Sequence, residues 1–235
     1  MKKILVVEPV FMDGIESEVD YVDAIKEPDT VVEFVGLESG PTSVETYYDE
    51  AFVVAGTLRL IEARAPGADA VVINCFADPG VIAARELLDI PVVGPSEASM
   101  ALAMQLAHRF AVVSVYENSV ALTELQARAR GIESRLAGVI GIELGVCELE
   151  EDIENTTRLL IEAARELIVT KGAEAIVLGC TGMVPAAAGL RAALDVPVIE
   201  PLAAAFKTAE AMVTLGLVHA HKGQYRRPDL SKLKS

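Results

Sequence analysis

The chain has 235 residues, of which 52% are hydrophobic and 23% are charged, and its formal net charge is −15. This composition is typical of a globular protein with one large domain or two small ones, long enough to bury a core. A protein this acidic is a poor candidate for binding a phosphate backbone, so we expect no nucleic-acid partner.

The sequence predicts neither export nor membrane insertion. Its first residues, MKKILVVEPVFMDG, begin like a signal peptide, but Glu8 interrupts an apolar run that is already too short, and no small-residue cleavage site follows. No stretch approaches the roughly 18 consecutive apolar residues of a membrane span. Three cysteines, an odd number, favour free thiols in a reducing compartment. We therefore expect a cytoplasmic protein with no membrane partner.

Short apolar runs rich in β-branched residues alternate with longer segments that mix charged and apolar residues. The runs do not alternate between apolar and polar residues, which is typical of parallel strands buried on both faces. In chain order, strands are expected at 4–8, 31–35, 69–75, 91–94, 109–115, 138–144, 174–180 and 197–200, and long helices at 44–64, 151–170 and 203–217. Strands that alternate with helices predict an α/β fold.

The sequence contains one internal repeat. GADAVVINC (67–75) aligns with GAEAIVLGC (172–180) at a spacing of 105 residues, and LLDIPVVGP (87–95) aligns with ALDVPVIEP (193–201) after one insertion. We therefore expect two pseudo-symmetric domains, each with a four-stranded parallel sheet flanked by helices. The first is expected at 1–97 plus 206–235, because the last helix should return to it, and the second at 98–205.

Both copies end their third strand in a cysteine, Cys75 in the first and Cys180 in the second. Ligands of open α/β sheets bind beyond the carboxyl ends of the strands, so a pseudo-two-fold axis would bring both thiols to one interdomain cleft. Asp78 is expected to cap the helix that follows Cys75, with Pro79 at its first position. A thiol at a helix N-terminus is expected to have a lowered pKa.

Two thiols on opposite walls of a cleft predict inversion of a carbon stereocentre by proton transfer. A thiolate would remove the proton from one face, and a thiol would return a proton to the other face. Backbone N–H groups at the two helix starts would stabilise the negative charge that develops. This chemistry needs a small-molecule substrate and no cofactor.

Other uses of the cysteines stay open at this level. Each could be a buried core residue, or the cleft could bind a small molecule without catalysis. We expect no metal, because the chain has no CxxC or HExxH pattern and no histidine near either cysteine in sequence. A disulfide would disable the proton transfer. Cys147 lies outside the repeat and is interpreted as structural.

The motifs INCFADPG (73–80) and LGCTGMVP (178–185) resemble those of the aspartate/glutamate/hydantoin racemase superfamily. Four further stretches are similar to its hydantoin racemase branch: GPTSVETYYDEA (40–51), CFADPGVIAARE (75–86), PVVGPSEASM (91–100) and LGLVHAHKGQYRRP (215–228). The resemblance covers nearly the whole chain. It implies a cofactor-independent two-base racemase of a 5-substituted hydantoin or allantoin, with the site between two α/β domains, in a homo-oligomer.

The same resemblance implies roles for individual residues. The expected acid–base pair is Cys75 and Cys180, and the expected substrate-contacting or pocket-shaping residues are Ser43, Phe76, Thr181 and Gly182. Alternatives within the superfamily are an amino-acid racemase, a decarboxylase of activated malonates and a cis–trans isomerase. Their carboxylate substrates would need cationic or amide anchors, and no Arg or Lys stands beside either cysteine in sequence.

The resemblance breaks after the first strand, where the family usually carries an Asn-Pro-Asn type motif. This chain has Glu8, Pro9 and Val10 there, and Glu8 and Pro9 are kept as candidate substrate-binding residues. A carboxylate at this place would favour a neutral or donor-rich substrate over an anionic one. Alternatively, the Glu8 side chain turns away from the pocket.

Overall fold

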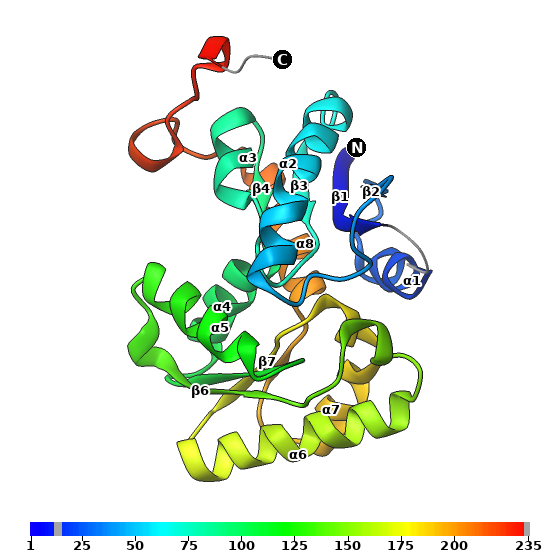
Figure 1. The fold of residues 1–235 in the computed structure, drawn as a ribbon, viewed down its shortest axis with the longest axis vertical. Coiled ribbons are helices and arrows are strands. Elements are labelled where there is room, and N and C mark those ends of the chain that lie inside the picture. The colour runs from blue at the N-terminus through cyan, green and yellow to red at the C-terminus, as the bar shows by residue number, and fades with distance from the viewer. Residues whose placement is uncertain (12–15, 233–235) are drawn as a thin grey trace.

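Two four-stranded parallel sheets with the same topology form the protein, which is described here by a computed structural model covering residues 1–11 and 16–232 (Figure 1). The first sheet has the order β2-β1-β3-β4, with β1 (Lys2–Phe11), β2 (Thr30–Leu37), β3 (Ala70–Ile73) and β4 (Val92–Val93). The second has the order β6-β5-β7-β8, with β5 (Phe110–Ser114), β6 (Leu136–Gly141), β7 (Ala175–Leu178) and β8 (Val198–Ile199). The predicted α/β fold with two four-stranded parallel sheets is confirmed.

Helices connect the strands in both halves. They are α1 (Glu16–Ile25), α2 (Tyr47–Arg64), α3 (Val81–Leu87), α4 (Pro95–Leu106), α5 (Asn118–Ala129), α6 (Ile153–Lys171), α7 (Ala187–Ala193) and α8 (Pro201–Leu215). Figure 1 shows α2 and α3 in the lobe of the first sheet and α6 and α7 in the lobe of the second. Helix α8 packs against β1, β3 and β4, so the chain does return to the first sheet. The domain limits given above stay a prediction.

Each inner strand is buried on both faces, which explains its continuous apolar sequence. In β1, Ile4 and Val6 face a central cluster that includes Phe206 of α8 and residues of both sheets. The alternating residues Leu5 and Val7 face a second cluster beneath α2. The central cluster joins the two halves into one packed unit, so the ends of both sheets are held in fixed relative positions.

The strand registers align the two halves residue by residue. Val7 pairs with Ile73 in the first sheet, and Val113 pairs with Leu178 in the second. The next residue along the chain then donates its N–H across the ladder: Asn74 N to Val7 O at 2.8 Å, and Gly179 N to Val113 O at 2.7 Å. The residues that follow, Cys75 and Cys180, therefore leave their sheets at equivalent points.

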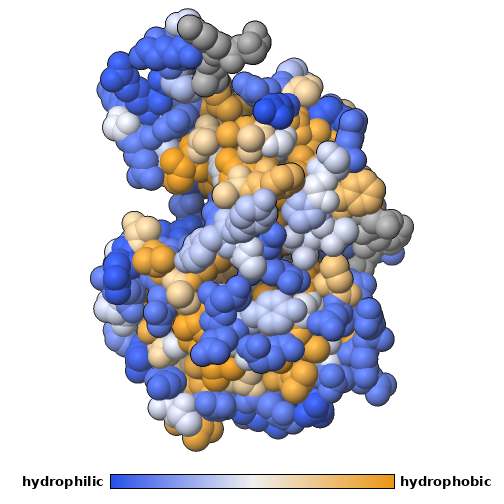
Figure 2. All heavy atoms as spheres, in the orientation of Figure 1, coloured by the Kyte–Doolittle hydropathy of each residue, from blue (hydrophilic) through white to orange (hydrophobic). Residues whose placement is uncertain are grey.

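Hydrophilic and hydrophobic residues are interspersed on the face shown in Figure 2, and the outline narrows on one side between the two lobes. Within the described residues, no helix is both long and apolar enough to cross a membrane.

Candidate active site

A cavity of about 450 Å³ lies where the carboxyl ends of the two sheets meet, and both strand-end cysteines line it. Its wall also contains the end of β1, the loop before α2, the start of α5 and the short 3₁₀ helix at Val146–Glu148. A cavity of this size suits a small organic molecule. All the residues predicted to be catalytic or substrate-binding line it: Glu8, Pro9, Ser43, Cys75, Phe76, Cys180, Thr181 and Gly182.

The two thiols sit in similar but not identical settings. Cys180 is buried, and Cys75 is partly exposed to the cavity. The hydroxyl of Thr181 lies 3.4 Å from the backbone oxygen of Asn74, so the two cysteine loops touch across the pseudo-symmetry axis. The cavity therefore brings together two thiols that are 105 residues apart in the chain.

Burial raises the pKa of both thiols, contrary to the expectation that a helix start would lower it. The pKa of Cys180 rises to about 12, although the N–H of Gly182 donates to the sulfur and opposes the rise. The pKa of Cys75 is raised further, against a similar donation from Ala77. Loss of hydration outweighs one or two backbone donors, because the charged form is the one that burial disfavours.

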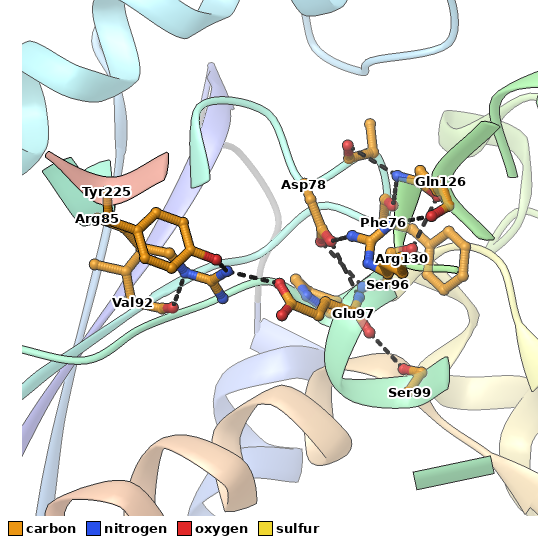
Figure 3. Close-up of polar contacts among 12 residues, drawn as sticks. Phe76, Asp78, Arg85, Val92, Ser96, Glu97, Ser99, Gln126, Arg130 and Tyr225 are labelled. Carbon is orange, nitrogen blue, oxygen red and sulfur yellow. Dashed lines mark hydrogen bonds and ion pairs between the residues drawn. The ribbon is translucent and has the colours of Figure 1, made fainter. Parts of the chain in front are cut away.

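Asp78 does not cap the helix that follows Cys75, and this prediction was wrong. Helix α3 begins at Val81, and its N-cap, Gly80, has a left-handed conformation with φ 74°. The Asp78 carboxylate instead accepts the N–H groups of Ser96 and Glu97, both at 3.0 Å, and so caps α4 (Figure 3). The loop that carries Cys75 is thereby tied to the next helix rather than to its own.

In the second half, the helix equivalent to α4 is α8, and a carboxylate of its own N-cap residue caps it. Glu200, the N-cap of α8, accepts the N–H groups of Leu202 and Ala203 at 2.7 and 2.8 Å. Gly94 occupies the N-cap of α4, where a Cβ atom would lie only 2.4 Å from Asp78 Oδ1. A glycine at this position therefore leaves room for a carboxylate from elsewhere in the chain.

Helix α5 of the second half fixes the Cys75 loop from the other side. The Gln126 amide donates to the carbonyls of Phe76 and Ala77 at 3.1 and 3.0 Å and accepts from the Ser96 hydroxyl at 2.8 Å (Figure 3). One turn later, Arg130 forms an ion pair with Asp78 at 2.6 Å. No motif in the sequence pointed to Gln126 or to Arg130, which directly follows α5.

The Glu8 side chain points inward, against the alternative that it turns away. It is 6% exposed and accepts a hydrogen bond from Asn74 Nδ2 at 2.8 Å. Burial raises the pKa of Glu8 from 4.5 to about 8, and the bond from Asn74 only partly offsets this. In the strand registers, Ser114 is the counterpart of Glu8, and its hydroxyl donates to Gly179 O at 3.3 Å. Strands β1 and β5 therefore have equivalent backbones at this point, but one carries a carboxyl group and the other a hydroxyl group.

Several lining residues were not found from the sequence. Asn74 directly precedes Cys75 and could have been noticed as a polar residue at the end of an apolar strand. Glu45 accepts from Ser43 Oγ at 3.1 Å and from Val146 N at 2.9 Å, which joins the loop before α2 to the second half. Cys147 is exposed and lines the cavity, and its interpretation as a structural residue stays a prediction.

Comparison with known proteins agrees with this architecture. The family model described as Asp/Glu/Hydantoin racemase matches residues 15–209. The chain is 35% identical to a hydantoin racemase of Paenarthrobacter aurescens over 229 residues, covering 96% of this chain and 97% of the relative. It is 38% identical to a hydantoin racemase of Pseudomonas sp. (strain NS671) over 202 residues, covering 86% and 81%.

The solved structure of an allantoin racemase from Klebsiella pneumoniae superposes with a TM-score of 0.94 at 33% identity, covering 100% of this chain and 97% of that one. The chain therefore belongs to the Asp/Glu/hydantoin racemase family.

Proposed function

We propose that the protein is a racemase that inverts the C5 stereocentre of a hydantoin-like ring, with Cys75 and Cys180 as the acid–base pair and without a cofactor. The observation that carries the proposal is the position of the two thiols. They leave equivalent strands of two equivalent sheets and line one cavity of about 450 Å³. The named hydantoin and allantoin racemases among the similar proteins support the choice of ring.

The reaction needs one thiolate and one thiol. The thiolate removes the proton from C5, which lies between a carbonyl carbon and a ring nitrogen, and the electron pair moves onto the carbonyl oxygen as an enolate. The other thiol then donates its proton to the opposite face of C5. The pair ends the turnover with its proton on the other sulfur, so the two cysteines exchange roles when the opposite enantiomer reacts.

Backbone donors beside the cysteines can stabilise the enolate. The N–H groups of Ala77 and Gly182 reach the two sulfurs, so they lie within the region where the negative charge moves during the reaction. Fixed donors of this kind cost no reorganisation when the charge develops, and each contributes about 3–4 kcal/mol in known oxyanion holes.

The experiment follows both optical activity and hydrogen exchange. Single enantiomers of several 5-substituted hydantoins and of allantoin are incubated with the protein in deuterated buffer under reducing conditions, with a protein-free sample for spontaneous exchange. Cys75→Ala and Cys180→Ala should each lose racemisation by at least about a hundredfold. Each should retain exchange without inversion for one enantiomer, and the two variants should differ in which enantiomer exchanges.

Cys147→Ser is the matched control, because it removes a thiol from the same cavity and should leave racemisation unchanged. Thermal unfolding shows that each variant is folded. Normal racemisation by both single alanine variants would sink the proposed mechanism.

The cellular setting is part of the proposal. Three free thiols suit a reducing compartment, which supports a cytoplasmic protein.

The exposed aromatic side chains of Tyr48 and Phe52 stack on the surface of α2 with ring centroids 6.5 Å apart, and such a pair supports a homo-oligomer. Sedimentation analysis of the parent and of Phe52→Ser tests the assembly, and a monomeric parent would exclude it.

A further inference from the structure

The cavity wall is acidic on both sides of the cysteine pair. Five carboxylate side chains line it, and the described lining residues include no lysine, arginine or histidine. These carboxylates belong to Glu8, Glu18, Glu45, Glu50 and Glu150. They come from β1, α1, the loop before α2, the first turn of α2 and the segment after the 3₁₀ helix at Val146–Glu148, so acidic side chains surround the cavity rather than marking one edge.

One acceptor on the wall is buried and has no partner. Asn74 is 3% exposed, and its Nδ2 is used by Glu8, but its Oδ1 makes no hydrogen bond with any described residue. An unpaired buried carbonyl costs about 1–3 kcal/mol, and an N–H donor from a bound molecule would remove that cost. Because Asn74 lines the cavity next to Cys75, the donor would belong to a ligand.

A second hydrogen-bond acceptor without a partner, a carboxylate, lies in the first turn of α2. Glu50 is half-buried in the wall, and among the described residues no hydrogen bond or ion pair holds its carboxylate. Burial raises the pKa of Glu50, with no partner to oppose the rise. The wall therefore offers acceptors, from an amide and from a carboxylate, that the protein itself leaves unused.

The same charges work against the proposed reaction. After burial, Glu18 and Glu45 are among the groups that raise the pKa of Cys180, and Glu8 contributes to the raised pKa of Cys75. Forming a thiolate or an enolate in this field is unfavourable unless the ligand supplies compensating positive potential. A positive charge or a set of N–H donors on the substrate provides it, and a carboxylate on the substrate makes it worse.

We propose that the cavity selects, among hydantoin-like rings, those whose 5-substituent ends in N–H donors, and disfavours those whose substituent ends in a carboxylate. The inference rests on the racemase function proposed above and specifies its substrate class. It places the N–H donors of the substituent against Asn74 Oδ1 and the Glu50 carboxylate, the two acceptors that the protein leaves unused, whereas a carboxylate in that position would meet acceptors alone.

Three matched rings test the selection. The hydantoins derived from lysine, norleucine and glutamate carry an ammonium group, a methyl group and a carboxylate at the end of similar alkyl chains, and allantoin adds a neutral ureido group. We expect kcat/KM to fall from the lysine ring to the norleucine ring to the glutamate ring. The first and last should differ by at least about tenfold, which corresponds to about 1.4 kcal/mol. Allantoin should exceed the norleucine ring, because its N–H groups can reach the same acceptors.

The variant Glu50→Gln tests whether the preference among substrates comes from the cavity wall or from the intrinsic reactivity of the rings. It should shrink the ratio between the lysine and glutamate rings severalfold, whereas Glu62→Gln, on the exposed side of the same helix, should leave the ratio unchanged. Equal kcat/KM for the lysine, norleucine and glutamate rings would overturn the inference and leave the racemase function standing. Racemisation of none of the four rings by the parent would overturn the proposed function as well.

Discussion

Replacement of Glu8 by glutamine should change the pH dependence of stability in a way that only a buried carboxyl can produce. Glu8 is 6% exposed, and burial raises its pKa from 4.5 to about 8. Glutamine has nearly the same shape and keeps an oxygen that can accept from Asn74 Nδ2, now at 2.8 Å from the carboxylate. The variant therefore removes the titration and keeps the contact.

The direction in which stability changes with pH follows from the number of protons bound in the folded and unfolded states. Between pH 4.5 and about 8, the unfolded chain has lost the Glu8 proton and the folded chain retains it. The free energy of unfolding therefore decreases as pH rises through this window, by at most about 1.4 kcal/mol per pH unit from this group. Over the whole window the loss is at most about 5 kcal/mol, and relaxation around the carboxylate reduces it below this bound.

Urea unfolding of the parent and of Glu8→Gln, followed by circular dichroism from about pH 5 to about pH 9 in reducing buffer, gives the difference at each pH. Other buried acids titrate in both proteins and cancel in the difference. The variant should gain stability relative to the parent as pH rises, while Glu38→Gln, at an exposed position, should follow the parent. A difference that stays flat across the window would refute the assignment of Glu8 as a buried, protonated acid.

Three further perturbations test the supports of the cavity. Gln126→Ala removes the donor to the two carbonyls after Cys75 and should lower kcat by about tenfold with little change in KM. It should also lower the free energy of unfolding by about 1–3 kcal/mol. An unchanged kcat in a less stable protein would mean that Gln126 has a purely structural role. Gly94→Ala places a Cβ atom 2.4 Å from the Asp78 carboxylate and should lower the free energy of unfolding, measured in urea, by about 1–3 kcal/mol. A variant as stable as the parent would contradict the capping of α4 by Asp78. In the folded parent, mass spectrometry after brief alkylation should find Cys147 modified before the other two thiols, because Cys147 is exposed whereas Cys75 is partly buried and Cys180 is buried. Modification of Cys180 first would contradict its burial.

The strands and the cysteine pair could be predicted from the sequence because their signals are local. Runs such as ILVV and AVVI are apolar at every position, and burial of alternate residues against two different clusters requires that pattern. The repeat placed Cys75 and Cys180 at equivalent strand ends, and the registers of β3 and β7 agree. The family motifs added Ser43, which no periodicity would have selected and which lines the cavity.

Contacts between distant parts of the chain decided the rest. A sequence pattern can place Asp78 before a helix but cannot show that its carboxylate reaches α4, because that depends on the space left by Gly94 and on Arg130 at the end of α5. The inward direction of Glu8 was likewise fixed by Asn74, 66 residues away.

The sequence by itself thus determined the two-sheet fold and the pair of thiols, since hydrophobic periodicity and repetition are written along the chain. Only the tertiary structure decided how buried those thiols are, which carboxylates surround them and which acceptors remain unpaired. These properties depend on hydration lost and partners gained when strands, loops and helices from both halves close around one cavity.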